Sequence, residues 1–294
     1  MELRHLRCFV VLAEELHFTR AAERLHIEQS PLSRTIKDLE QELGVLLFKR
    51  DRRGTHLTFA GEVFLEQVRR VFNNLEQATA SAKAAALGYG GTLRIAVSDG
   101  TAEPRLSAWL ARCREEEPEV EIRLFDVPLA EQLRGLRKGH FDAGFARIDD
   151  VGEDIVAQAI WQDTLLLAVP ARHPLLVHRR VPLVDLARYP LVACDPYACE
   201  GGNRQVVRLL RALDEKPCFV EHATSLGMML TLVAAGYGLG FVTAGQMAAV
   251  RHPDVVVRPI LGGDALLTTY VLCAAANATQ QLSRFIARLS DLPD

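Results

Sequence analysis

The spacing of apolar residues over positions 1–58 predicts short helices joined by tight turns. A first helix is indicated by apolar residues at helical spacing, namely Leu6, Phe9, Val10, Ala13 and Leu16. A second short helix is expected over 20–25, with Thr19 as its N-terminal cap. The next four residues, 26–29, form a turn of about the length that joins the elements of a helix-turn-helix.

Ser30 and Pro31 then favour the start of a third helix, since serine is a preferred cap and proline tolerates the first helical position. Its buried face is predicted from apolar residues one helical turn apart, namely Leu32, Ile36, Leu39 and Leu43. Gly44 is expected to end this helix. Two apolar runs around the charged tip at 49–54 then predict a β-hairpin, or wing.

A long helix with a continuous apolar seam is predicted next. Apolar residues recur at alternating steps of 4 and 3, namely Phe64, Val68, Val71, Leu75, Ala78, Ala82 and Ala85. A sustained repeat of about 3.5 residues is the signature of a coiled coil. Because no second long heptad pattern follows in the chain, a homodimer is the economical inference. The helix is expected to end at the glycine-rich joint 88–91.

From residue 92 onward, predicted strands and helices alternate, which implies an α/β domain with parallel strands. The first set is expected at 93–97, 103–117, 120–125, 129–138 and 141–145. A second set runs through 164–169, 190–194, 202–213, 218–221, 225–235 and 239–242. Strands near 255–260 and 267–274 and a helix over 279–289 complete the pattern.

Composition excludes several classes of protein. The chain has 294 residues, of which 24% are charged, and a formal net charge of -3, which together indicate an ordered globular protein of about two domains. No stretch approaches the about 18 uncharged apolar residues of a membrane span. The chain opens without a signal-peptide pattern, so the cytoplasm is the expected compartment and no membrane the expected partner. The six cysteines are scattered without a C-x-x-C pair, which favours buried reduced thiols over a metal site.

Five segments, in order, resemble the LysR-type transcriptional regulators. They are FVVLAEE at 9–15, FTRAAERL at 18–25, QSPLSRTIKDLE at 29–40, LGVLLFKR at 43–50 and LTFAG at 57–61. More diffuse matches at 141–145 and 236–240 extend the resemblance toward the C-terminus.

The resemblance implies a winged helix-turn-helix domain over 1–58, a dimerising linker helix and joint over 59–90, and an effector-binding domain over 91–294. That last domain is expected to be a two-lobed α/β structure of periplasmic-binding-protein type, with lobe I at 91–161 and 268–294 and lobe II at 162–267. The resemblance also implies homotetramers built from dimers, and DNA contacts that change when an effector binds. RNA polymerase is a further candidate partner.

The recognition helix of a helix-turn-helix offers its N-terminal turn to the major groove. The residues expected to meet base edges there are Gln29, Ser30, Ser33, Arg34 and, one turn further, Lys37. Thr19 and Ser30 suit phosphate contacts, and Arg52 and Arg53 at the wing suit the minor groove or the backbone. The alternative is that these polar groups are solvated caps and loops. A dimer presents two such helices, so double-stranded DNA with an inverted repeat is the expected partner.

Ligands of two-lobed α/β domains settle at the carboxyl ends of strands, between the lobes. Candidate effector-binding residues at such positions are Ser98, Thr101, Arg147, Asn203 and Thr224. Each of them could instead cap a helix. Arg147 can pair a carboxylate bidentately, as the corresponding arginine does in some regulators of aromatic catabolism that this chain resembles, which favours an organic acid. Leu129 stands where many relatives have Ser or Thr, and Asp99 adds negative charge, so a neutral or cationic effector stays open.

Three rival functions fit the sequence less well. An enzyme is disfavoured because the motifs of common catalytic and nucleotide-binding sites are missing, and no cofactor or metal is expected. A solute-binding protein fits the lobes but not the first 90 residues or the missing signal peptide. A redox-responsive regulator would use Cys199, although Arg208 stands where peroxide-sensing relatives have their second cysteine. Cys194 or Cys218 would have to replace it.

Overall fold

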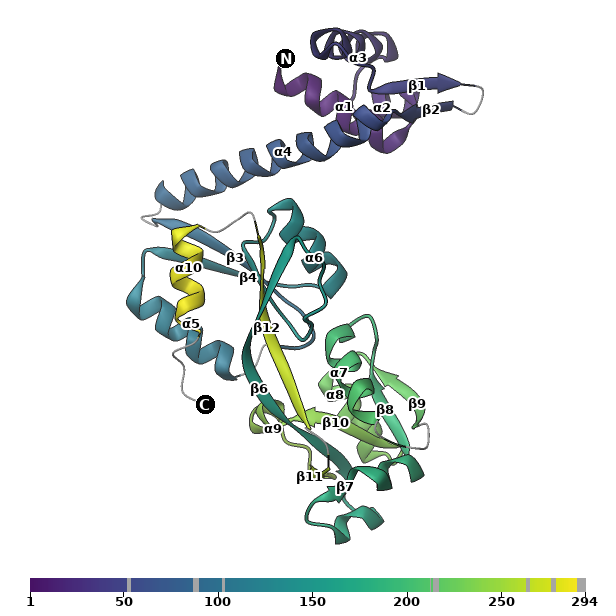
Figure 1. The fold of residues 1–294 in the computed structure, drawn as a ribbon, viewed down its shortest axis with the longest axis vertical. Helices are drawn as coiled ribbons and strands as arrows, with labels where there is room; N and C mark the ends of the chain where they lie inside the picture. Colours follow the sequence, from purple (N-terminus) through teal and green to yellow (C-terminus); the bar gives the residue numbers. More distant parts are fainter. Residues whose placement is uncertain are drawn as a thin grey trace. The chain divides into compact units, whose positions relative to one another are not determined.

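Three short helices and a two-stranded hairpin form the first part of the chain in the computed structural model (Figure 1). The helices α1 (Leu3–Glu15), α2 (Phe18–Arg24) and α3 (Gln29–Leu43) precede the antiparallel strands β1 (Phe48–Asp51) and β2 (Gly54–Leu57). The structure describes residues 1–51, 54–86, 90–101, 104–211, 213, 217–262, 265–275 and 279–289. The chain divides into two units, Met1–Ala80 and Ser81–Asp294.

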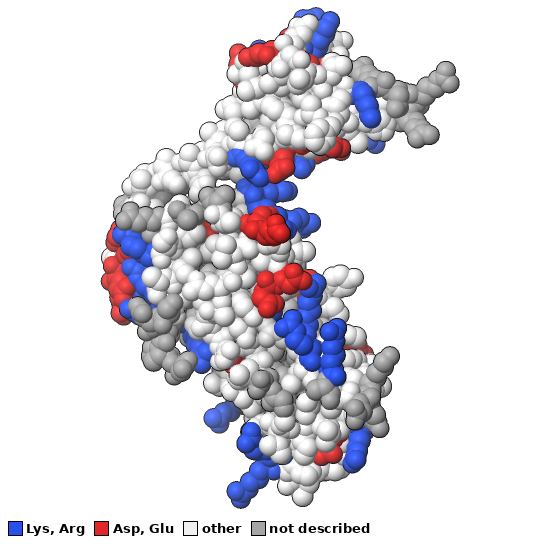
Figure 2. All heavy atoms as spheres, viewed as in Figure 1, with Lys and Arg blue, Asp and Glu red and all other residues white. Residues whose placement is uncertain are grey.

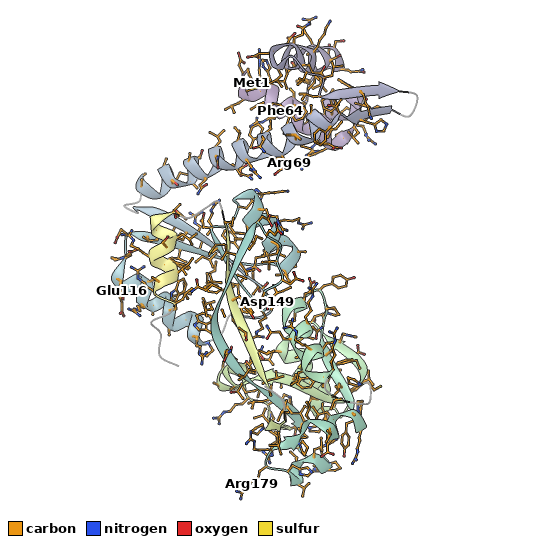
Figure 3. The ribbon with its side chains drawn as sticks, viewed as in Figure 1. Met1, Phe64, Arg69, Glu116, Asp149 and Arg179 are labelled. Atoms are coloured by element: carbon orange, nitrogen blue, oxygen red, sulfur yellow. The ribbon has the colours of Figure 1, made fainter. Side chains whose placement is uncertain are left out.

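One apolar core holds the first unit together. It contains buried residues of all three helices and of the strand β1, and the Phe9 ring lies at its centre. The ring centroid of Phe9 is 5.5 Å from that of Phe48 and 5.1 Å from that of Phe64, which is labelled in Figure 3. Gly44 ends α3 at a φ of +69°, a backbone conformation that favours glycine. The predicted order of three helices and a wing is confirmed.

Two predicted helix caps are wrong by a few residues. The ring of His17, rather than Thr19, accepts a hydrogen bond from the N–H of Arg20, and α2 begins at Phe18. The helix α3 begins at Gln29, so Ser30 and Pro31 lie inside its first turn. Proline is tolerated there because the first N–H groups of a helix have no partner within it.

The long helix α4 (Phe59–Ala86) divides its predicted seam between two environments. Phe64 and Val68 pack into the core of the first unit. Further along the same seam, Val71 and Leu75 are each 44% exposed. The apolar seam therefore has two parts. The first part packs against the chain's own helices, and the residues Val71 and Leu75 of the second part face solvent in the single chain.

A mixed sheet runs through the second unit. Its strands β3 (Gly91–Val97), β4 (Val120–Asp126), β5 (Ala143–Ala146), β6 (Ile155–Pro170), β8 (Pro190–Cys194), β9 (Cys218–Ala223), β10 (Leu239–Thr243) and β12 (Leu266–Ala274) follow the order β4-β3-β5-β12-β6-β10-β8-β9 in the described part of the chain. Beside β6 lie β11 (Val255–Leu261) and, next to it, β7 (Val181–Pro182).

The long strands β6 and β12 pair antiparallel with each other and connect the two lobes (Figure 1). The first lobe contains β3, β4 and β5 with α5 (Pro104–Glu116), α6 (Leu129–Lys138) and the C-terminal α10 (Gln280–Ala287). The second lobe contains β7 to β11, α7 (Glu200–Leu210), α8 (Leu226–Ala234), α9 (Ala244–Ala249) and the 3-10 turns η1 (Pro174–Val177) and η2 (Leu183–Arg188). The predicted α/β architecture with two lobes is confirmed.

Each lobe has apolar packing of its own. In the first lobe the buried ring of Trp109 lies 5.7 Å from that of Phe145 and 4.0 Å from that of Phe285, which attaches α10 to α5. In the second lobe Leu167 and Leu191 are among the fully buried residues of the largest cluster. The sequence predicted only 164–169 of β6, because the polar residues before position 164 interrupt the apolar run.

Candidate functional site

The first turns of α3 present polar side chains to solvent. Gln29, Ser30, Arg34 and Lys37 are exposed and Ser33 is half-buried, whereas Leu32, Ile36 and Leu39 lie in the core. The exposed face carries the donors and acceptors that can read base edges. The hydroxyl of Thr19 donates to Oε1 of Gln29 at 3.3 Å, which brings the start of α2 to the start of α3.

Some basic side chains near this face form ion pairs within the chain, and others do not. Arg24 forms ion pairs of 2.9 Å with Glu14 and 3.1 Å with Glu15. Arg34 and Lys37 form no ion pair with any described residue, so their charges remain available to a polyanion. The face of the first unit drawn in Figure 2 carries both basic and acidic side chains. The predicted wing contacts Arg52 and Arg53 lie outside the described residues.

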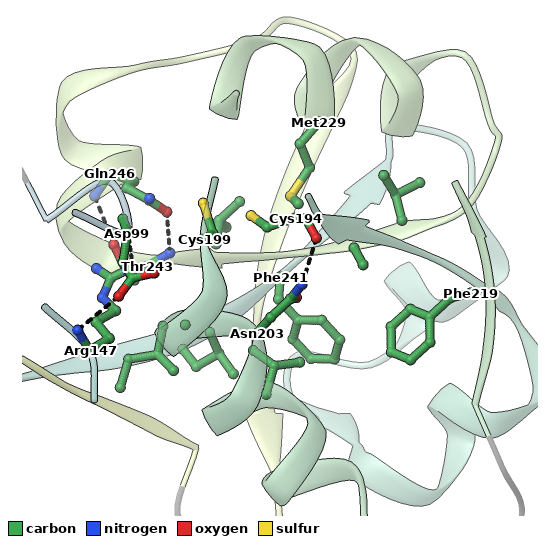
Figure 4. A pocket seen from close by; sticks show the side chains of 17 residues that line it. Asp99, Arg147, Cys194, Cys199, Asn203, Phe219, Met229, Phe241, Thr243 and Gln246 are labelled. Carbon is green, nitrogen blue, oxygen red and sulfur yellow. Dashed lines mark hydrogen bonds between the residues drawn. The ribbon is translucent and has the colours of Figure 1, made fainter. Parts of the chain in front are cut away.

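In the second unit a narrow cavity is lined by residues of both lobes (Figure 4). Asp99 and Arg147 come from strand ends of the first lobe. Polar groups of the second lobe include Asn203, Thr243 and Gln246. Apolar side chains complete the wall, namely Leu165, Val192, Val206, Phe219, Met229, Phe241, Val242 and Leu267. A mostly apolar cleft with a few convergent polar groups is typical of a small-molecule site.

Asp99 joins the two lobes at the edge of this cavity. Its carboxylate accepts the N–H of Arg147 at 3.0 Å and, across the lobes, the N–H of Gly201 at 2.9 Å. Burial raises the pKa of the Asp99 carboxyl, and these N–H groups act in the opposite direction. A second link comes from Gln205 on α7, whose amide donates to the carbonyls of Arg147 at 2.7 Å and Thr268 at 2.8 Å.

Two cysteines lie in the cavity wall. Cys194 is the last residue of β8 and Cys199 directly precedes α7. The interaction between their thiols lowers the pKa of Cys194, opposed by burial and helped by the charge of Arg147. The same interaction, together with burial, raises the pKa of Cys199.

The five predicted effector residues are placed differently. Arg147 and Asn203 line the cavity, where the amide of Asn203 donates to the Cys194 carbonyl at 2.6 Å. The hydroxyl of Ser98 is buried and donates to Gln132 at 2.9 Å, and that of Thr101 donates to the Ser98 carbonyl at 2.8 Å. Thr224 is exposed. These last three are not among the described residues that line this cavity.

Sequence reasoning missed Thr243 and Gln246 because it did not predict α9. Thr243 and Gln246 form a capping box at the start of that helix: the Thr243 hydroxyl accepts the Gln246 N–H at 3.1 Å and the Gln246 amide oxygen accepts the Thr243 N–H at 3.0 Å. A threonine followed three residues later by glutamine is the sequence signal for this motif, and it would have marked the helix start.

Nowhere in the described ranges do three or more His, Cys, Asp or Glu side chains gather around one possible metal position. No helix in the described part of the chain is both long and apolar enough to cross a lipid bilayer.

Comparison with known proteins identifies both parts of the chain. Residues 86–293 match the family described as "LysR substrate binding domain", and residues 3–62 match "Bacterial regulatory helix-turn-helix protein, lysR family". The chain is 35% identical over 267 residues to the uncharacterized HTH-type transcriptional regulator YnfL of Escherichia coli (strain K12), covering 90% of each. It is 31% identical over 278 residues to the probable cat1 operon transcriptional activator of Acinetobacter lwoffii, covering 94% of this chain and 91% of that one. The structure of full-length CbnR complexed with its target DNA superposes with a TM-score of 0.69, at 27% identity and 99% coverage of both chains.

Proposed function

This chain belongs to the LysR family of bacterial transcriptional regulators, and from that premise we propose that it binds an inverted-repeat promoter site through α3 and an organic acid in the cavity between its lobes. The observation that carries the proposal is the cavity itself, whose wall combines Arg147 of one lobe with Asn203, Thr243 and Gln246 of the other. A ligand that contacts both lobes stabilises one arrangement of them over others, which is how binding changes a protein's state.

Arg147 is the group we assign to the acid. Its side chain is 4% exposed at the wall of the cavity, and Nη1 donates to the Asp99 carbonyl over 3.4 Å. A guanidinium in a largely apolar cleft can bind a carboxylate through two parallel hydrogen bonds. The cavity offers amide and hydroxyl groups for the rest of the ligand. Arg147 and the polar groups of the cavity support binding of a regulatory ligand rather than catalysis.

For the DNA site we assign Gln29, Ser30, Ser33, Arg34 and Lys37 to the major groove and Thr19 to phosphate. The assignment rests on their shared exposed face and on the hydrogen bond from Thr19 to Gln29. We further propose that the chain is divided into a DNA-binding domain at 1–58, a linker helix and joint at 59–90 and an effector-binding domain at 91–294. Two chains would form a dimer through α4, and dimers would form tetramers. The protein would act on promoters in the cytoplasm, together with RNA polymerase.

One experiment with two variants tests both sites, because each variant is the control for the other. Arg34→Ala should weaken binding to a footprinted operator about 10–100-fold, the equivalent of about 1–3 kcal/mol, while leaving acid binding intact. Arg147→Gln should bind the operator like the parent but bind the acid about 10–100-fold more weakly, since it loses charge-assisted hydrogen bonds.

Operator binding is measured by fluorescence anisotropy at fixed salt, and acid binding by calorimetry with a panel of small carboxylates and their uncharged amides. The effector proposal is wrong if no carboxylate binds the parent, or if Arg147→Gln binds it unchanged. The DNA assignment is wrong if Arg34→Ala still distinguishes the operator from scrambled DNA as the parent does.

A further inference from the structure

Three sulfur atoms lie in the wall of the cavity. Cys194 ends β8, Cys199 precedes α7 and Met229 lies on α8, and all three line the cavity. Figure 4 shows the three side chains directed into the same part of the wall, with the Cys194 sulfur between the other two. The thiols of Cys194 and Cys199 lie close enough to shift each other's pKa. Neither thiol is part of a disulfide.

The backbone holds the two thiols in this position. The N–H of Cys199 donates to the Asp195 carbonyl at 2.9 Å, so the chain turns back within the short segment between the cysteines. The Asp195 carboxylate accepts two further N–H groups of the same turn, at 2.9 and 3.0 Å. At the other end, Asn203 of α7 holds the Cys194 carbonyl at 2.6 Å. The backbone at both cysteines is therefore fixed by bonds that do not involve the sulfur atoms.

The surroundings suit a soft cation. Thiolate and thioether sulfur are soft ligands that select ions such as Cu(I), and hard oxygen ligands do not compete for it. The apolar side chains of Val192 and Phe241 line the same cavity. The positive charge of Arg147 favours negative charge on both sulfurs, and the negative charge of Asp99 opposes it. Binding of one monovalent ion releases two thiol protons and leaves a dithiolate complex of net charge −1 beside this guanidinium.

We propose that Cys194 and Cys199 form a binding site for a soft monovalent cation, Cu(I), with the thioether of Met229 as a weaker third ligand. The site uses the lobe II wall of the cavity and does not depend on the identity of the acid proposed above. A bound ion would link the end of β8 to the start of α7, the helix whose first turn bonds to Asp99 of the other lobe.

The test uses the reduced full-length protein under anaerobic conditions, titrated with Cu(I) in competition with the chromogenic chelator bicinchoninate. The parent should take up one ion per chain. Cys194→Ser and Cys199→Ser should each lose affinity by about 100-fold or more, beyond the 10–100-fold typical of losing a supporting group. Met229→Leu keeps the volume of the side chain and should lose much less affinity. Cys218→Ser, which removes an exposed thiol of the same lobe, should bind like the parent.

X-ray absorption at the copper edge gives a second measurement that needs no variant. Sulfur-only coordination of the ion in the parent supports the site, and nitrogen or oxygen coordination overturns it. The proposal also fails if the parent does not compete with the chelator, or if both serine variants bind as the parent does. Because the readout is the metal alone, these failures leave the results with carboxylates and operator DNA unaffected.

Discussion

At the scale of single residues, the contact between the lobes depends on the absence of a side chain at Gly201. A Cβ atom at this position would lie 2.5 Å from the Asp99 carboxylate and 2.8 Å from the Arg147 carbonyl. Gly201→Ala should therefore break the N–H bond to Asp99 and destabilise the second unit by about 1–3 kcal/mol, the usual cost of overpacking. Urea unfolding measures the change.

Gly227 is the matched control, because nothing lies within 4 Å of the position that its Cβ would occupy. It stands in α8, where alanine is the better helix former, so Gly227→Ala should leave stability unchanged or raise it by up to about 1 kcal/mol. Equal stability of Gly201→Ala and the parent would show that the lobes do not depend on this contact.

Other residues of the site show what sequence alone cannot give. Ser98 and Thr101 stand at the end of β3, where hydroxyl donors are expected to face a ligand. In the structure Gln132 of α6, more than 30 positions away, is fully buried and takes the Ser98 hydrogen bond. No local pattern predicts that partner. The place of Arg147 in the cavity was predictable, because an arginine at the end of a buried strand requires polar or charged partners.

At the scale of elements, the spacing of apolar residues predicts most helices and strands. The ranges expected for α6 and β8 are those observed, and α10 and β12 differ by one or two residues. The failures have physical reasons. The first half of β6 alternates with polar residues, and α9 is too short to show a helical period. The heptads of α4 predicted a partner helix, but spacing cannot say that Phe64 and Val68 find theirs within the chain.

The rest of that seam yields a prediction about assembly. Leu75 on α4 is 44% exposed in the single chain, and an exposed apolar seam on a long helix is stabilised by a second copy. Leu75→Lys should raise the dissociation constant of the dimer by about 10-fold or more, because the dimer loses the free energy gained by burying a leucine side chain. Sedimentation equilibrium measures the shift. Glu76→Lys changes the neighbouring exposed position, outside the seam, and should leave the dimer intact.

At the scale of the whole molecule, the helix α10 is joined to α5 of the first lobe by an ion-pair network. Arg288, which follows α10, pairs with Glu117 at 2.8 Å and Glu116 at 2.5 Å, at the end of α5. The side chains of Arg288 and Glu117 are only 14% and 12% exposed. Hydrogen bonding to Arg288 lowers the pKa of the Glu117 carboxyl below its ordinary value.

The lowered pKa sets the sign of a pH dependence. A carboxylate whose pKa is lower in the folded chain adds stability above its ordinary pKa of about 4.3. That stability is lost as the pH falls through the folded value. Arg288→Met should thus lower the free energy of unfolding by about 1 kcal/mol at pH 7, the upper range for pairs near the surface, and the difference from the parent should shrink toward zero in acid. Urea unfolding from pH 7 down to pH 3 follows it.

Arg188 provides the control, since it is 76% exposed and its ion pair with Asp185 is 3.7 Å long. Arg188→Met should unfold like the parent at every pH, because an exposed pair of that length contributes little. If Arg288→Met instead loses the same stability at pH 3 as at pH 7, the pair does not act through its charges. The loss would then come from the packing of the arginine's aliphatic stem between α10 and α5, and α10 would be held by apolar contacts such as that of Phe285 with Trp109.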